Sequence, residues 1–290
     1  MKLALFTAVC TAMVTPFLDG KINFPMLQIL LRRQMDAGIG SVVLAGTTGE
    51  SATLSDEEKI SLFRHAKEFV GDQMQIFAGT GSNDTKHAIA LSIAAQNAGA
   101  DGLLIVSPYY NKATADGLVA HYRAISEAVD IPIILYNVPS RTGVDMPVSV
   151  YQQLAQLPNI AGIKEASTDI GKILRIRAEC PEDFCIWAGN DHLTVPILSL
   201  GGKGVISVIS NLFPEQMSLM ANAALDGDFD TASALQCHML PWTDFLGCEV
   251  NPIPIKAAMA AYGYDCGCGR LPLTPLSPAN QKALSALMGC

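Results

Sequence analysis

Lys164 is the residue of this chain best suited to covalent chemistry, because it stands alone among small and apolar residues in the segment 160–167. The segment is short and rich in β-branched residues, which favours a buried strand. Side chains alternate along a strand, so we expect Lys164 to share a roomy face with Gly162 and Ala166. A lysine that leaves water is less stable in its charged form, and a neutral amine can attack a carbonyl. The pattern indicates a Schiff-base lysine, although a strand-end lysine that reaches solvent has the same local sequence.

The loop after the second predicted strand offers groups that suit a carboxylate. Thr47 and Thr48 stand between glycines in the segment 46–51. Adjacent hydroxyls and exposed backbone N–H groups make a cradle for an anion. An ordinary tight turn has a similar composition. The loop is not a Walker phosphate-binding loop, because no Gly-Lys-Ser/Thr follows it.

Two further strand ends carry side chains that could take part in catalysis. Tyr109 and Tyr110 follow the fourth predicted strand. Tyr136 lies at the end of the fifth, and Arg141 follows it. Tyrosines at strand ends often only pack the rim of a barrel. Strand ends that together offer hydroxyls, phenols, an arginine and a lysine indicate a catalytic site. A second lysine, Lys203, precedes its strand, on the face that normally serves stability.

No metal site is predicted from the five histidines and eight cysteines. A zinc site needs Cys or His residues clustered at ligand spacing, and the chain has neither a Cys-x-x-Cys pair nor an HExxH motif. Cys266 and Cys268 are the only closely spaced pair, and no role is assigned to them. Reduced thiols in a cytosolic protein are expected.

Eight short apolar segments alternate with helical segments in the first part of the chain. The predicted strands are 6–14, 41–46, 75–79, 102–107, 131–137, 160–166, 184–188 and 204–209. The predicted helices between them include 55–70, 84–98, 115–129 and 169–179. This alternation implies parallel strands with crossover helices, and eight units predict an α/β fold of the (β/α)8 TIM-barrel type. A doubly wound open sheet is the alternative, but no GxGxxG follows the first strand.

Only helical patterns follow residue 213. The predicted helices are 215–225, 230–246, 255–262 and 278–288. Turns rich in proline and glycine separate them, and no linker would free them from the rest of the chain. We therefore expect a barrel over residues 1–213 and a C-terminal helical region over 214–290.

Composition and charge exclude several functional classes. Half of the 290 residues are hydrophobic, which allows a large core, and the net charge of −8 comes without a block of like charge. This balance argues against nucleic-acid binding. The apolar start, 3–14, mimics a short signal peptide, but Thr7 and Thr11 interrupt it, so a first strand is predicted instead. No apolar run reaches membrane-spanning length, and we expect a cytoplasmic protein.

Several segments together resemble the dihydrodipicolinate synthase family, now called 4-hydroxy-tetrahydrodipicolinate synthases, among the pyruvate-dependent class I aldolases. They are 46–50, 109–111, 136–143, 162–166, 251–256 and 270–273. The resemblance implies a lyase that condenses pyruvate with L-aspartate-4-semialdehyde in lysine and diaminopimelate biosynthesis. It also implies that no cofactor is needed, because pyruvate forms a covalent imine with the enzyme.

The resemblance assigns catalytic roles to four residues. Lys164 would form the imine, and Tyr136 would move protons from imine formation through attack on the aldehyde. Thr47 would link Tyr136 to Tyr110, which in this family comes from the partner subunit. A dimer would therefore complete the site, and the family is usually a homotetramer built as a dimer of dimers.

The resemblance also assigns binding roles. Thr48 would hold the pyruvate carboxylate, and the planar fork of Arg141 would hold the carboxylate of the semialdehyde. Gly189 and Ile206 match backbone positions that line the pyruvate pocket. Sialic acid lyases share the lysine strand but lack the run 139–143, so Arg141 favours the synthase over a lyase or another 2-keto acid aldolase.

A non-enzymatic, pyruvate-binding barrel is the alternative from another class of protein. Such a chain would be expected to lose at least one member of the catalytic set, and the sequence keeps all of them. The residues concerned are Lys164, Tyr136, Thr47 and Tyr110.

Regulation by lysine is predicted to be weak or absent. Sensitive members of the family bind lysine in a cleft at the dimer interface, where an acidic residue receives its ammonium group. The matching position here is His87, which is a poor partner for an ammonium group. The residues that match this cleft are Ser51, Ala52, Asn83, His87 and Tyr109.

Overall fold

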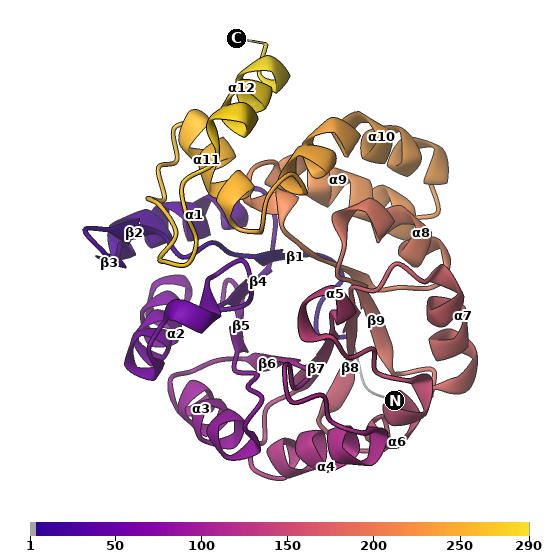
Figure 1. Ribbon diagram of the computed structural model, residues 1–290. Coiled ribbons are helices and arrows are strands. Elements are labelled where there is room, and N and C mark those ends of the chain that lie inside the picture. The colour runs from indigo at the N-terminus through magenta and orange to yellow at the C-terminus, as the bar shows by residue number, and fades with distance from the viewer. Residues whose placement is uncertain (1–3, 290) are drawn as a thin grey trace.

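The computed structural model describes residues 4–289, in which eight parallel strands form a closed barrel surrounded by helices (Figure 1). The strand order is β1-β10-β9-β8-β7-β6-β5-β4, so the predicted (β/α)8 barrel is confirmed. The strands are β1 (Ala8–Ala12), β4 (Ser41–Leu44), β5 (Gln75–Gly79), β6 (Gly102–Val106), β7 (Ile133–Asn137), β8 (Ile160–Glu165), β9 (Cys185–Ala188) and β10 (Gly204–Ser207). The apolar start is strand β1 as predicted, although its first residue, Leu3, lies outside the described part.

Helices follow the barrel strands and form a ring around them in chain order (Figure 1). They are α1 (Phe24–Asp36), α2 (Asp56–Val70), α3 (Thr85–Asn97), α4 (Ala115–Ser126), α6 (Val148–Leu154), α7 (Ile170–Glu179), α8 (Thr194–Ser199) and α9 (Pro214–Leu225). The short helix α5 (Pro139–Thr142) follows β7 and lies inside this ring in the view of Figure 1. None of the helices within residues 4–289 is long and apolar enough to cross a membrane.

Helix α1 and the hairpin before it, β2 (Phe17–Leu18) with β3 (Lys21–Ile22), were not among the sequence predictions. The helix has ordinary start signals, because the Asn23 side chain accepts a hydrogen bond from the Met26 N–H at 3.1 Å and a proline lies in the first turn. Predicted strand 204–209 is too long, since a 3-10 turn begins at Ile209.

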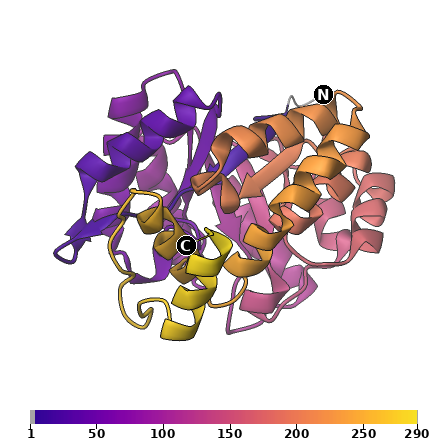
Figure 2. The same ribbon diagram turned by 90° about the horizontal axis from the view of Figure 1, so that it is seen from above.

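Helix α9 packs against β1 and α8 and completes the ring of barrel helices. The expected boundary between the barrel and the C-terminal region, after residue 213, therefore lies before α9, although this helix packs on strand β1 of the barrel. The remaining helices are α10 (Phe229–Leu246), α11 (Ile253–Ala261) and α12 (Pro278–Leu287). Figure 2 shows the C-terminal segment, in yellow, between the indigo N-terminal elements and the orange α9 and α10.

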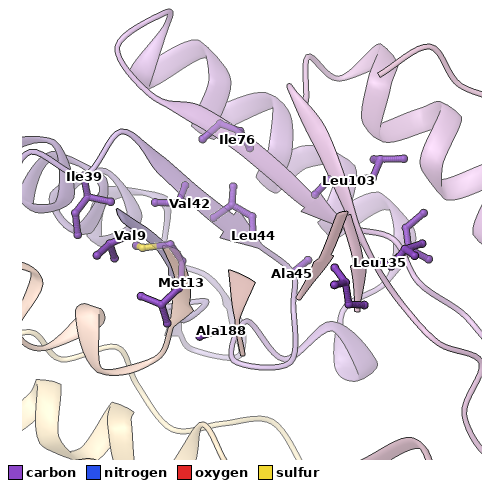
Figure 3. Close-up of a cluster of buried hydrophobic side chains, with 14 of the residues drawn as sticks. Val9, Met13, Ile39, Val42, Leu44, Ala45, Ile76, Leu103, Leu135 and Ala188 are labelled. Atoms are coloured by element: carbon purple, nitrogen blue, oxygen red, sulfur yellow. The ribbon is translucent and has the colours of Figure 1, made fainter. Parts of the chain in front are cut away.

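The hydrophobic core has two layers, because successive side chains of a barrel strand point to opposite faces. Val42, Leu44 and Ile76 belong to the outer layer between strands and helices (Figure 3). Inside the barrel, the Phe6 ring stacks on Trp187 with centroids 5.0 Å apart. Phe6 precedes β1, so these rings fill the amino end of the barrel and leave the carboxyl end for a cavity.

Candidate active site

A cavity of about 240 Å³ lies at the carboxyl ends of the barrel strands. It gathers side chains that lie far apart in the sequence and that the sequence predicted to act together. Among its lining residues are Thr47, Thr48, Tyr136, Arg141, Lys164 and Gly189. The site is therefore assembled by the ends of β4, β7, β8 and β9, where a barrel of this kind normally places its chemistry.

Lys164 and Tyr136 face each other inside the barrel. The pairing of β7 with β8 places the two residues opposite one another, and the Lys164 Nζ lies 4.3 Å from the centroid of the Tyr136 ring. Only 5% of Lys164 is exposed, so its amine does not reach bulk solvent as the alternative of a surface strand-end lysine requires. A buried amine beside the phenol ring of a tyrosine is suited to nucleophilic attack with proton transfer close by.

Glycines allow β8, the strand that carries Lys164, and β9 to approach closely. A Cβ atom at Gly162 would lie 2.0 Å from the Cys185 carbonyl oxygen. A Cβ atom at Gly189 would lie 2.6 Å from the Cβ of Ala166. Neither position can therefore carry a side chain without moving the backbone. This close packing fixes the wall of the cavity around the lysine.

A buried polar network holds β7 and β8 from outside the barrel. The Glu165 Oε1 accepts a hydrogen bond from the Asn137 side-chain amide at 2.8 Å, and its Oε2 accepts one from the Tyr151 hydroxyl at 3.1 Å. The Lys172 Nζ lies 3.5 Å from Glu165 Oε2. Burial and the nearby Glu165 raise the pKa of Tyr151, so its hydroxyl stays a donor. Because Asn137 and Glu165 follow Tyr136 and Lys164, the network fixes the strands of these two residues, β7 and β8, relative to each other.

The loop 46–51 is held from both sides. The Thr15 hydroxyl donates to the Gly49 carbonyl at 2.7 Å, and the Thr48 hydroxyl accepts a hydrogen bond from the Asn251 side-chain amide at 2.9 Å. Glu50 adopts a left-handed conformation with a φ of 57° and turns its side chain toward Lys256. The loop therefore presents its threonines to the cavity from a fixed position.

Arg141 lies at the mouth of the cavity. The one-turn helix α5 carries it, and Gly143 ends this helix in the left-handed conformation with a φ of 71°. The arginine side chain is exposed, where it can meet an incoming anion. Ile206 is fully buried in the barrel interior and is not among the lining residues of this cavity, whereas Val208, two residues further on, lines it. The role expected of Ile206 concerns its backbone and stays a prediction.

Asp191 lines the cavity but was not predicted from the sequence. Its Oδ2 accepts hydrogen bonds from the backbone N–H groups of Val208 and Ile209, both at 3.0 Å. Burial raises the pKa of this carboxyl, whereas the Ser207 hydroxyl and the Lys164 ammonium group act in the opposite direction. The sequence does contain a signal for Asp191, because an acidic residue stands shortly after a predicted barrel strand, two positions after Gly189.

A second cavity of about 540 Å³ adjoins the first, and the two share Thr47, Tyr136, Arg141 and Asn251. Most of the residues that the resemblance assigns to a regulatory cleft line this second cavity. Of the predicted cleft residues, Ser51, Ala52, His87 and Tyr109 line it. Asn83 is not one of its lining residues, and its carbonyl accepts a hydrogen bond from the Asn111 side chain at 2.9 Å.

An acidic residue in the second cavity is already paired. The Asp56 Oδ2 lies 2.8 Å from the Nε2 of His87, and its Oδ1 lies 3.5 Å from the Lys59 Nζ. The other ring nitrogen of His87 lies 3.1 Å from the Ser82 hydroxyl. Two basic side chains therefore surround the Asp56 carboxylate, and the other carboxylate that lines this cavity, Glu50, is paired with Lys256.

Tyr110 and Lys203 lie away from the first cavity. Tyr110 is 89% exposed and adopts a left-handed conformation with a φ of 70°. Lys203 lies just before β10, where its backbone N–H donates to the Ile186 carbonyl and its carbonyl accepts from the Ala8 N–H. It is therefore at the amino end of the barrel, as the sequence predicts.

No group of three or more His, Cys, Asp or Glu side chains within residues 4–289 is arranged to hold a metal ion.

Comparison with known proteins places the whole chain in one family. The model of the dihydrodipicolinate synthetase family matches residues 5–289. The 4-hydroxy-tetrahydrodipicolinate synthases of Acetivibrio thermocellus and Methanosarcina mazei are 42% and 47% identical, covering 98% and 97% of this chain and 97% of each relative. The solved synthase of Methylacidiphilum fumariolicum SolV superposes with a TM-score of 0.96 at 42% identity, covering 98% of this chain and 95% of its own. The chain is a member of the dihydrodipicolinate synthetase family.

Proposed function

We propose that this protein is a 4-hydroxy-tetrahydrodipicolinate synthase, a lyase that condenses pyruvate with L-aspartate-4-semialdehyde through a Schiff base on Lys164. The observation that carries the proposal is the buried Lys164 amine, 4.3 Å from the Tyr136 ring in a cavity that Thr48 also lines. This set provides a nucleophile, a proton-transfer group and an anion cradle within one small space.

The proposed reaction begins with attack of the Lys164 amine on the C2 carbonyl of pyruvate. Water leaves, and the resulting imine withdraws electrons from the methyl carbon, which then loses a proton to give an enamine. The enamine carbon attacks the aldehyde carbon, and Tyr136 supplies the proton that the new alkoxide takes up. The amino group of the semialdehyde portion then adds to the imine carbon and expels the Lys164 amine, which closes the ring and releases the product from the enzyme. The imine itself accepts the electrons, so the proposed chemistry uses no cofactor.

Reduction of the imine tests this proposal directly. Incubation with pyruvate and borohydride should attach a stable adduct to the peptide that contains Lys164, and mass spectrometry would locate it. The same preparation should consume L-aspartate-4-semialdehyde when pyruvate is present. An adduct without condensation would favour a regulatory, pyruvate-binding barrel. No adduct, or one on Lys203, would overturn the proposal.

The Arg141→Ala variant should distinguish the two substrates. We expect kcat/KM for the semialdehyde to fall by about 10- to 100-fold, because a hydrogen bond to a charged group contributes roughly 1.5–3 kcal/mol. The pyruvate concentration that gives half-maximal imine trapping should not change. Arg123→Ala, an exposed change on α4, is the matched control. An unchanged KM for the semialdehyde would instead favour an aldolase with a neutral acceptor.

Tyr110 should act in the active site of a partner subunit, since it is 89% exposed and lies outside the cavity of its own chain. We expect Tyr110→Phe and Lys164→Arg each to be inactive alone. After the two variants are refolded together, about a quarter of wild-type activity should return, because half of the dimers are mixed and each has one complete site. Absence of recovery in verified mixed dimers would show that Tyr110 is not shared between subunits.

Free lysine at millimolar concentration should leave the initial rate of the wild-type enzyme nearly unchanged. The reason is that His87 and Lys59 already pair with Asp56, so an added ammonium group finds no free carboxylate. His87→Glu should create sensitivity, whereas His87→Gln, which adds no charge, should not. Inhibition of the wild type by sub-millimolar lysine would contradict this prediction.

A further inference from the structure

The C-terminal helical region holds the loop 46–51 at two points. The Asn251 side-chain amide, two residues before α11, donates a hydrogen bond to the Thr48 hydroxyl at 2.9 Å. Within α11, the Lys256 Nζ lies 2.5 Å from the Glu50 Oε1. The region therefore contacts the carboxylate-binding loop directly, in addition to packing against the barrel helices.

The direction of the first hydrogen bond determines what Thr48 can offer to a ligand. A threonine hydroxyl has one hydrogen to donate and lone pairs that accept. Because Thr48 accepts from Asn251, its hydrogen is not used in that contact and remains available in the cavity. If Thr48 were the donor instead, its hydroxyl hydrogen would be bonded to Asn251, and only lone pairs would face an anion in the cavity.

Asn251 itself belongs to the cavity wall. It lines both cavities, and its Oδ1 is buried without a hydrogen-bond partner among the described residues. A buried, unpaired carbonyl oxygen is costly, so it should be satisfied by a donor that enters the cavity. The residue is thus positioned at the junction between the loop and the ligand space.

We infer that Asn251 is a positioning residue, which orients the Thr48 hydroxyl so that its hydrogen points to the carboxylate of the 2-keto acid. This inference rests on the proposed function and adds a residue of the C-terminal region to substrate binding. It predicts that the C-terminal region affects pyruvate affinity through one hydrogen bond and not only through the stability of the fold.

The Asn251→Asp variant tests the direction of the hydrogen bond, because aspartate has nearly the same shape but can only accept when ionised. Thr48 must then donate to it, and a negative charge lies beside the anion site. We expect the pyruvate concentration for half-maximal borohydride trapping to rise at least about tenfold. The maximal extent of trapping should be kept, and affinity should recover as the pH falls and the new carboxyl is protonated.

Asn251→Ala and Thr48→Val complete a double-mutant cycle. If Asn251 acts through Thr48, the loss caused by Asn251→Ala should become negligible in the Thr48→Val background. A purely structural role predicts additive losses, and an Asn251→Asp variant that binds pyruvate as the wild type does would also overturn the inference. Should Asn251→Asp fail to fold, the cycle alone decides. Trapping at Lys164 in the wild type is measured in parallel, so failure of the proposed function is recognised separately.

Discussion

The Lys164→Arg variant should lose at least about three orders of magnitude in kcat/KM, which corresponds to about 4 kcal/mol of transition-state stabilisation. Arginine keeps the positive charge and much of the length of lysine, but its guanidinium stays protonated and cannot form an imine with a ketone. Loss of activity would therefore report covalent chemistry and not a missing charge beside Tyr136. The measurements are steady-state turnover and borohydride trapping with pyruvate.

Lys203→Arg is the matched control for this variant, because it makes the same change at the amino end of the barrel, just before β10. We expect it to keep wild-type turnover and a full adduct on Lys164. Turnover by Lys164→Arg above a hundredth of the wild-type rate would mean that the reaction proceeds without the imine. The aldolase mechanism would then have to be abandoned.

Much of the barrel could be predicted from the sequence, because local patterns determine it. Eight apolar segments of strand length, separated by capped helices, have few other arrangements as one domain. The segment around Lys164 combines two such signals, since Gly162 is required by close strand packing and the lysine follows two residues later on the same face. Whether that lysine is buried or reaches solvent depends on the packing of the barrel, because both alternatives have the same local sequence.

The parts that could not be predicted depend on contacts between distant segments. Asn251 and Thr48 are 203 positions apart, and nothing in either local sequence indicates that they meet. Asp191 has its role only because the turn after β9 approaches the backbone after β10. Helix α9 was assigned to the C-terminal region because helical patterns run on without a break, whereas packing on β1 joins it to the barrel.

The buried pair formed by Lys256 and Glu50 should make a large contribution to stability. The Glu50 side chain is completely buried, that of Lys256 is 5% exposed, and the Lys256 Nζ also lies 4.4 Å from the Phe17 ring centroid. Lys256→Met keeps the length of the side chain but leaves the Glu50 carboxylate without its partner. We expect the free energy of unfolding to fall by about 3–5 kcal/mol, because an unpaired buried charge is strongly unfavourable. Chemical denaturation would measure this change.

The double variant Glu50→Gln with Lys256→Met shows whether charge is the cause. The double variant removes the uncompensated carboxylate, so it should be more stable than Lys256→Met alone. Glutamine has nearly the same volume as glutamate, so the change at position 50 removes the charge and keeps the packing. Lys282→Met, an exposed change on α12, should stay within about 0.5 kcal/mol of the wild type. Equal losses in the single and double variants would attribute the effect to packing around Phe17.

Because Glu50 shares its loop with Thr48, Lys256→Met should also weaken pyruvate binding. That weakening should diminish in the double variant, in which Glu50→Gln neutralises the carboxylate.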